Sequence, residues 1–142
     1  MLALREAQFR AAGLSVQKAR YLRDLASRFL NGTIKTRSFA KLSDETIKQK
    51  LLIVKGIGPW SADMFLIFAL NRPDVLPTED LGIKKGFQKV FSLRRLPSAR
   101  TMIHLAAPYR GRRTLLSLYL WQTVDNSASA ADAPRPRPGE PW

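Results

Sequence analysis

Apolar residues recur every three to four positions along most of this chain, which is the spacing of a helix with one buried face. The clearest case is residues 16–30, where Ser15 precedes the helix as a cap and Asn31 with Gly32 ends it. No segment alternates between apolar and polar residues as a half-buried strand would. The pattern therefore predicts an all-α fold. The apolar positions of this helix are Tyr21, Leu22, Leu25, Phe29 and Leu30.

Capping residues and helix breakers predict further helices along the chain. Gly13 stops the first of them, and Pro59 suits the first turn of a later one. Asp80 and Ser98 are N-cap candidates for two more. Several short helices joined by short loops are typical of an orthogonal multi-helix bundle. Besides residues 16–30, the predicted helices cover residues 2–12, 43–54, 59–70, 80–91, 98–106 and 112–123.

The last segment, residues 125–142, differs in composition from the rest of the chain. It is rich in Ala, Ser and Pro and carries almost no large apolar side chain. Such a segment buries too little surface to offset the entropy lost on ordering it. We therefore expect a folded domain over residues 1–124, followed by a disordered Pro/Ala-rich tail.

The charge balance is the unusual feature of the composition. Lys and Arg number 24 against 11 Asp and Glu, a net charge of +13, and the predicted tail is slightly acidic, so the folded part holds the excess. The absence of cysteine and the single histidine, His104, exclude disulfides, thiolate metal sites, a cysteine nucleophile and a multi-histidine metal site. Neither a membrane span nor a signal peptide is visible. These features predict a soluble, intracellular protein that binds a polyanion.

Residues 51–63 predict a helix, a tight turn and a second helix, which together form a helix-hairpin-helix. Gly56 and Gly58 flank Ile57, and both glycines suit a positive φ or the close approach of another backbone. Ile57 is expected to pack into the core and lock the turn. The N–H groups of the turn and of the second helix would then form an anion site suited to a DNA phosphate. An ordinary turn between helices is the alternative, and the basic character of the chain favours phosphate binding.

This hairpin, read together with residues 72–86, resembles the helix-hairpin-helix DNA glycosylases of base-excision repair, and more narrowly the 3-methyladenine DNA glycosylase II branch. A hairpin alone is common among DNA-binding proteins, whereas a hairpin followed at this distance by Asp-Leu-Gly-Ile-Lys-Lys is specific. Residues 13–22, 107–110 and 118–121 also fit, so the similarity covers roughly residues 10–123. The family places further helices before this segment, and a truncated gene product, a piece of a longer protein and a reduced protein with another role are the open explanations.

The resemblance assigns catalysis to Asp80, because the family carries a catalytic aspartate a short distance after its hairpin. A fixed carboxylate stabilises the positive charge that develops on the deoxyribose as the N-glycosidic bond breaks, and it can orient or deprotonate the attacking water. Taken from the residues alone, Asp80 is better explained as an N-cap, and both roles can coexist. The neighbouring Glu79 is expected to be solvated, and Asp74 to form a turn.

Trp60 stands where bifunctional relatives carry a lysine nucleophile, and tryptophan cannot form a Schiff base. The resemblance therefore implies a monofunctional glycosylase that leaves an abasic site and needs no cofactor. The expected substrate pocket includes Trp60, Met64 and Tyr109, although Trp60 fits core packing equally well. No side-chain metal site is expected, but backbone carbonyls at such a hairpin, here those of Val54 and Ile57, can hold a monovalent cation in this family. The expected DNA contacts are Lys55, Gly56, Ile57, Gly58, Lys84, Lys85 and Arg110.

Two functions of different classes are the leading hypotheses. The first is an enzyme that releases alkylated purines, such as 3-methyladenine or 7-methylguanine, from duplex DNA after flipping the base. The second is a non-catalytic helix-hairpin-helix module that grips the backbone of duplex DNA. An RNA-associated helical protein is a third possibility, and only the charge of the chain suggests it.

Overall fold

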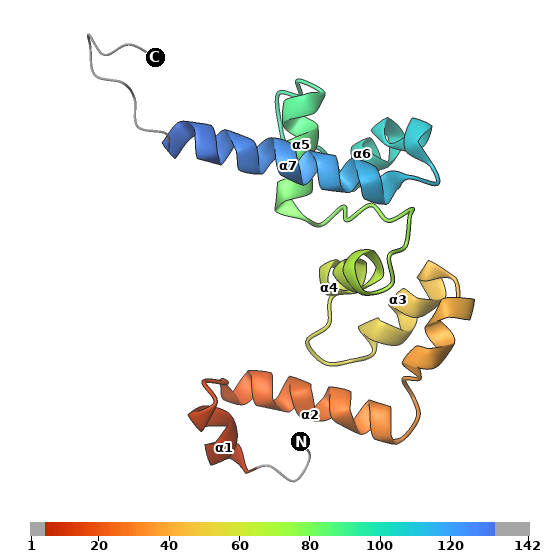
Figure 1. Cartoon of the computed structure of the whole chain (residues 1–142), viewed down its shortest axis with the longest axis vertical. Helices are drawn as coiled ribbons and strands as arrows, with labels where there is room; N and C mark the ends of the chain where they lie inside the picture. The colour runs from red at the N-terminus through yellow and green to blue at the C-terminus, as the bar shows by residue number, and fades with distance from the viewer. Residues whose placement is uncertain (1–4, 133–142) are drawn as a thin grey trace. The chain divides into compact units, whose positions relative to one another are not determined.

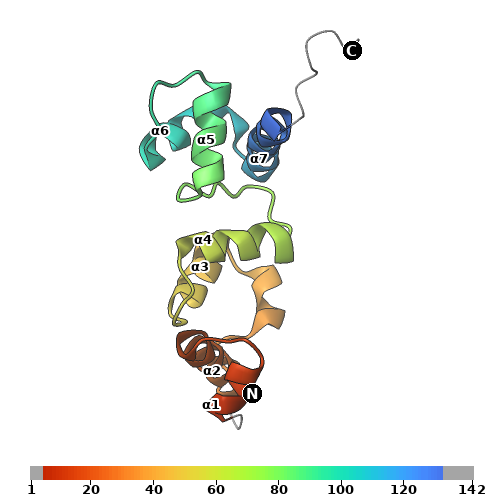
Figure 2. The ribbon, with the colours of Figure 1, turned by 90° about the vertical axis from the view of Figure 1, so that its left-hand side faces the viewer.

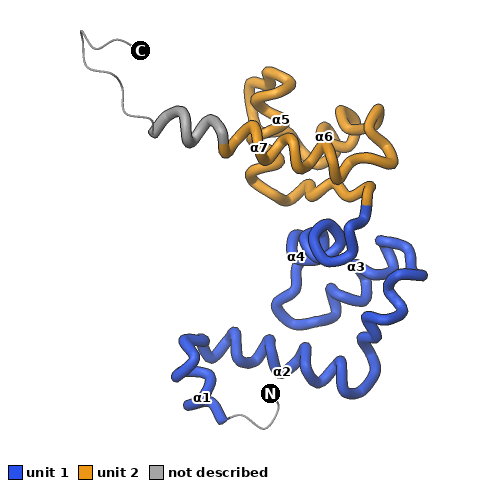
Figure 3. The backbone as a smooth tube through the Cα atoms, in the orientation of Figure 1, with its two compact units in different colours: residues 1–72 blue, residues 73–142 orange. Residues whose placement is uncertain are grey.

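The computed structural model describes residues 5–132 and divides the chain into two compact units, Met1–Arg72 and Pro73–Trp142 (Figure 3). All regular elements among the described residues are helices, so the predicted all-α class is confirmed. Within the same residues, no helix is both long enough and apolar enough to cross a membrane.

The first unit is built from α1 (Glu6–Ala11), α2 (Val16–Leu30), a 3-10 helix η1 (Thr36–Lys41), α3 (Asp44–Leu52), α4 (Pro59–Met64) and a π-helical turn η2 (Phe65–Ala69). The helices α1 and α2 pack against each other, and so do α3 and α4 (Figures 1 and 2). Ser15 and Ser43 cap α2 and α3 by accepting hydrogen bonds from backbone N–H groups three residues later. The predicted helix-hairpin-helix is therefore present as α3, a turn and α4.

The core of this unit includes a short element that the sequence pattern did not predict. Phe39 of η1 is fully buried and packs edge-to-face on Phe65, with 5.9 Å between the ring centroids. The Arg72 side chain secures η1 by donating to the carbonyls of Phe39 at 2.8 Å and Leu42 at 2.9 Å. A single buried aromatic in a polar segment shows no helical period, so only tertiary packing reveals this helix.

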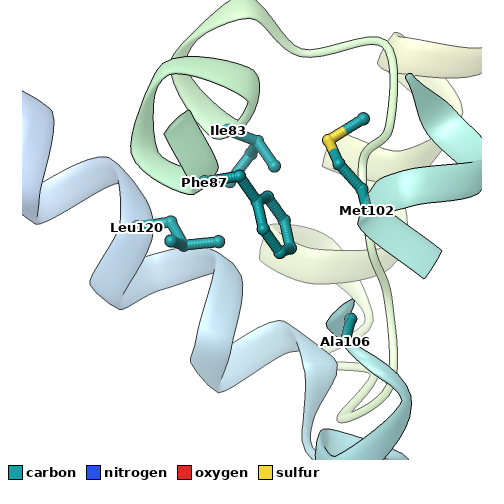
Figure 4. Close-up of a cluster of buried hydrophobic side chains, with 5 residues drawn as sticks. All are labelled: Ile83, Phe87, Met102, Ala106 and Leu120. Atoms are coloured by element: carbon teal, nitrogen blue, oxygen red, sulfur yellow. The ribbon is translucent and has the colours of Figure 1, made fainter. Parts of the chain in front are cut away.

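The second unit contains α5 (Leu81–Val90), α6 (Ala99–Leu105), a 3-10 turn η3 (Ala107–Tyr109) and α7 (Arg113–Asp132). Phe87 of α5 lies at the centre of its core, with Leu120 of α7 on one side and Met102 of α6 on the other (Figure 4). The helices α5 and α7 approach closely at Gly86, where an added Cβ would lie 2.7 Å from the Leu120 carbonyl oxygen. This close crossing fixes α7 against the helix that follows Asp80.

The predicted helix ends are correct for most elements and wrong for two. Helix α2 has the predicted bounds, whereas α1 begins at Glu6 and residues 1–4 lie outside the described residues. The larger correction concerns α7, which continues to Asp132 instead of ending near residue 123. Alanine and serine extend the helix because alanine is the best helix former, and the first proline comes only at Pro134. Residues 125–132 of the expected disordered tail are therefore helical, and the rest of that tail lies outside the described part.

Candidate active site and helix-hairpin-helix

Asp80 lies at the start of α5, at the end of the loop that connects to the first unit. Its Oδ1 accepts a hydrogen bond from the Ile83 N–H at 2.8 Å, and its backbone is extended, with φ −70° and ψ 126°. These are the features of an N-cap residue, so the capping role expected from the sequence is confirmed. The carboxylate is half-buried, which leaves it accessible from outside the unit.

A second donor reaches the same carboxylate from α7. The indole Nε1 of Trp121 donates to Asp80 Oδ1 at 2.8 Å, across 41 residues of sequence. Gly82 makes this contact possible, because a Cβ at that position would lie 2.8 Å from Trp121 Cδ1 and 3.0 Å from Asp80 Oδ1. Sequence reasoning used Trp121 only as part of the family resemblance and did not assign it a role. The signal that could have suggested a close approach is the glycine in the first turn of a helix.

The loop before Asp80 is attached to the first turns of α7. Arg113 donates to both carboxylate oxygens of Asp74, at 2.7 and 2.8 Å, and the Arg113 backbone N–H points to the same carboxylate. Thr114 Oγ1 accepts from the Val75 N–H, and Ser117 Oγ donates to the Val75 carbonyl. Asp74 was expected only to form a turn. It also anchors the N-terminus of α7 to the loop.

This anchor predicts a pH-dependent stability. Hydrogen bonding to the Arg113 side chain lowers the pKa of Asp74 from 3.8 to about 2. A carboxyl group whose pKa falls on folding stabilises the fold above its unfolded pKa, and this contribution is lost as the pH drops from 3.8 to about 2. We expect Asp74→Asn to lower the free energy of unfolding at pH 6 by about 2 kcal/mol, and by clearly less at pH 2.5.

Urea unfolding of wild type and variant at both pH values measures this difference. Asp125→Asn is the matched control, because Asp125 is an exposed acid on α7 and its replacement makes the same charge change. Its stability relative to wild type should be the same at both pH values. If Asp74→Asn lowered the free energy of unfolding equally at pH 6 and pH 2.5, the charge of Asp74 would not be the source of its stabilising effect.

The two glycines of the hairpin have different roles. Gly56 has a positive φ of 86°, and an added Cβ would overlap the ring of Tyr21 from α2. Gly58 has an ordinary φ of −98° as the N-cap of α4, and an added Cβ would meet nothing within 4 Å. Of the two glycines that could adopt a positive φ, only Gly56 does so, because the turn needs a left-handed residue at that position alone.

The hairpin is held by α2 and not by burial of Ile57, which is only half-buried. Asp24 of α2 accepts from the Lys55 backbone N–H at 2.9 Å, and Arg28 holds the pKa of Asp24 below its usual value through a side-chain hydrogen bond. The Ile57 N–H donates to the Val54 carbonyl at 3.1 Å. Two turn N–H groups are thus used within the chain, contrary to the expectation that they point outward together. Those of Gly56 and Gly58 donate to no other described residue.

The expected pocket and DNA-contact residues lie in both units. Trp60 and Met64 share one face of α4, and Trp60 is 48% exposed, so it is not a core residue. Tyr109 is exposed at the end of η3, where it lines a hollow of about 380 Å³ with Pro108, Arg112, Leu115, Leu116 and Tyr119. Lys55, Lys85 and Arg110 are exposed and Lys84 is half-buried. Asp80 also accepts a hydrogen bond at its backbone carbonyl from the Lys84 N–H, at 3.0 Å.

The comparisons with known proteins define the class. Residues 1–109 match the HhH-GPD superfamily of base-excision DNA repair proteins, and the chain belongs to this superfamily. It is 37% identical over 118 residues to DNA-3-methyladenine glycosylase 1 of Schizosaccharomyces pombe, covering 80% of this chain and 50% of that protein. It is 46% identical over 92 residues to the DNA-3-methyladenine glycosylase of Saccharomyces cerevisiae, covering 61% of this chain and 30% of that protein.

A solved structure supports the same assignment. The 3-methyladenine DNA glycosylase of Schizosaccharomyces pombe in complex with abasic DNA is similar with a TM-score of 0.79 and 33% identity, over 87% of this chain and 61% of that one. The resemblance inferred from the hairpin and from residues 72–86 is therefore confirmed. The chain spans about half the length, or less, of the curated relatives it matches.

Proposed function

We propose that this chain carries the catalytic aspartate of a monofunctional DNA glycosylase that hydrolyses the N-glycosidic bond of alkylated purines, such as 3-methyladenine, in duplex DNA. The observation that carries the proposal is the fixed, half-buried carboxylate of Asp80, which follows a helix-hairpin-helix in a chain of the HhH-GPD superfamily. The relatives named DNA-3-methyladenine glycosylases support the substrate class. Such a protein acts on DNA inside the cell, in the nucleoid of a bacterium or the nucleus of a eukaryote.

The proposed reaction gives Asp80 an electrostatic role. The bond between C1′ of the deoxyribose and the purine nitrogen breaks, and its electron pair leaves with the purine. Positive charge then develops on the sugar, and a fixed carboxylate stabilises it. Water adds its oxygen to C1′, and its proton passes to the Asp80 carboxylate or to solvent. An alkylated purine already carries positive charge, so it leaves as a neutral base without protonation by a second acid.

The product of this reaction is an abasic site with an intact strand. Trp60, which the resemblance places at the position of the lysine nucleophile of bifunctional relatives, has no amine to attack C1′. Within the first unit, its exposed indole, with Met64 beside it, is suited to the face of a flipped, electron-poor base. Tyr109 of the second unit stays a further proposed pocket residue. No cofactor takes part in the proposed reaction.

The proposed DNA contact is the hairpin turn. The N–H groups of Gly56 and Gly58 would donate to a phosphate, with Lys55, Ile57, Lys84, Lys85 and Arg110 as further contacts. The hydrogen bond from the Ile57 N–H uses one of the two lone pairs of the Val54 carbonyl. The carbonyls of Val54 and Ile57 would hold a monovalent cation, whose positive charge would attract a DNA phosphate.

Gly58→Ala tests the phosphate contact. Because an added Cβ meets no protein atom within 4 Å and φ is ordinary, the fold should be unchanged. The methyl group would project into the space where a phosphate must approach, and we expect about tenfold weaker binding, the loss of one hydrogen bond to a charged group. Fluorescence anisotropy should show the same loss for damaged and undamaged duplexes, because a phosphate contact carries no base information. A loss confined to damaged duplex would contradict the assignment.

The alternative function is a non-catalytic duplex-binding module. It is favoured by one observation, that the hydrogen bond from the Ile83 N–H accounts for Asp80 as a helix cap without a catalytic role. The two functions separate in one assay, in which the purified chain is incubated with methylated genomic DNA and free methylated purine is quantified by chromatography. Release above the spontaneous rate supports the glycosylase. Duplex binding with no release supports the module, and preference for single-stranded RNA in competition would support neither.

A further inference from the structure

We propose that Trp121 is a positioning residue, whose indole N–H fixes the orientation and the ionised state of the Asp80 carboxylate. The inference rests on the proposed function, because it assigns Trp121 a part in the same reaction. Two donors from different helices converge on one oxygen. The Ile83 N–H of α5 and the Trp121 indole of α7 each lie 2.8 Å from Asp80 Oδ1.

The hydrogen bond from Trp121 restrains the Asp80 carboxylate more than a helix cap alone would. A cap needs one hydrogen bond to the backbone, and the terminal torsion of an aspartate side chain is otherwise broad. A second bond, from an indole on another helix, restricts rotation of the carboxylate about its Cβ–Cγ bond. Hydrogen bonds donated to a carboxylate also favour its charged form, which is the form that stabilises a cationic sugar. Orientation and charge of Asp80 thus both depend on a residue far away in sequence.

Two glycines on one face of α5 adapt this helix to the contact. Gly82 and Gly86 are four residues apart and therefore lie on the same side of the helix. A Cβ at Gly82 would press on Trp121 Cδ1, and a Cβ at Gly86 would press on the Leu120 backbone. Glycine within a helix costs up to about 1 kcal/mol relative to alanine, so two of them in ten residues disfavour α5 locally. Because these two glycines have no side chain, α7 can approach α5 closely, and this approach brings the Trp121 indole to the Asp80 carboxylate.

The same face of α7 also holds the loop that leads to Asp80. Arg113, Ser117 and Trp121 follow each other at intervals of four residues. Arg113 binds Asp74 at the beginning of the loop, Ser117 binds the Val75 carbonyl, and Trp121 binds Asp80 at its end. Helix α7 therefore holds this loop at three positions. Of the three α7 side chains, Trp121 is the one that contacts the proposed catalytic group.

Trp121→Phe separates positioning from packing, because it keeps an aromatic side chain and removes the N–H. The first readout needs no activity: the Asp80 carboxyl carbon is followed by 13C NMR as a function of pH in the full chain, with Asp80→Asn to assign its signal. We expect its titration midpoint to move to higher pH in Trp121→Phe. Gln122→Ala, an exposed neighbour on α7, should leave the midpoint at its wild-type position.

The second readout is base release from methylated DNA under single-turnover conditions. Trp121→Phe should lower the rate constant about tenfold, which corresponds to the loss of one hydrogen bond to a charged group. The substrate concentration at half-maximal rate should be unchanged. The acid limb of the pH profile should move to higher pH. Gly82→Ala retains the indole but displaces it from Asp80 and should act in the same direction. A structural role would lower the amount of folded protein without moving the acid limb.

The outcomes distinguish this inference from the proposed function. A shifted NMR midpoint without base release by wild type would support the positioning contact and reject glycosylase activity of this chain. An unshifted midpoint in Trp121→Phe, in a variant that is folded by circular dichroism, would overturn the inference whatever the activity. An unchanged pH profile in an active variant would overturn it as well.

Discussion

Replacing Asp80 by asparagine is expected to lower base release by on the order of 10²–10³-fold, the effect of removing one preorganised electrostatic group from an active site. The physical reason is the loss of negative charge beside the developing cation, since an amide is neutral. The fold should survive, because asparagine is as good an N-cap as aspartate. Its side-chain oxygen can still accept from the Ile83 N–H and the Trp121 indole. Duplex binding should therefore change little, and the loss should fall on the chemical step.

Two further variants make this experiment specific. Glu79→Gln makes the same change of net charge one residue away, on an exposed side chain, and should leave base release at the wild-type rate. Asp80→Ala removes the charge and the cap together, so it should add a loss of about 1 kcal/mol of stability to the same loss of rate. If Asp80→Asn retained full activity, Asp80 would be a cap and no more. If Glu79→Gln were equally inactive, base release would depend on the total negative charge near the site and not on the Asp80 carboxylate in particular.

The parts of the fold that the sequence predicted depend on neighbours in the chain. Ser15, Ser43, Asp80 and Ser98 accept the backbone hydrogen bonds expected of N-caps. Capping is a contact across three residues, and its participants can be read directly from the sequence. The same is true of Pro59 in the first turn of α4. The candidate catalytic residue was found because a local pattern, a hairpin followed by the Asp80 segment, carries the resemblance.

The parts that were missed depend on contacts between segments far apart in sequence. Nothing near Asp80 indicates that Trp121 reaches it, and nothing near Lys55 indicates that Asp24 binds its N–H. The 3-10 helix around Phe39 has no period to detect. Glycines gave only a partial signal, because their sequence positions show where a side chain is absent and not what approaches. Gly56 and Gly58 look alike in the sequence. Only the structure shows that Gly56 has a positive φ and lies against Tyr21, whereas the space beside Gly58 is open.

The structural difference between Gly56 and Gly58 leads to the second prediction, which concerns the stability of the fold. Gly56→Ala is expected to lower the free energy of unfolding by several kcal/mol. A left-handed conformation costs a non-glycine residue about 1–2 kcal/mol, and here φ is 86°. Forcing a methyl group into a filled space typically costs about 1–3 kcal/mol more, and the space here holds the Tyr21 ring. Urea unfolding followed by circular dichroism measures the sum.

A double-mutant cycle with Tyr21→Ala divides this loss into its two causes. Removing the ring opens the space beside Gly56, so the cost of Gly56→Ala in the Tyr21→Ala background should fall to the backbone contribution alone. Gly58→Ala is the matched control, since its stability should stay near that of wild type while its DNA binding weakens. Equal costs of Gly56→Ala with and without Tyr21 would show that the ring moves aside freely. In that case α2 would hold the hairpin through the hydrogen bond from Lys55 to Asp24 and not through Tyr21.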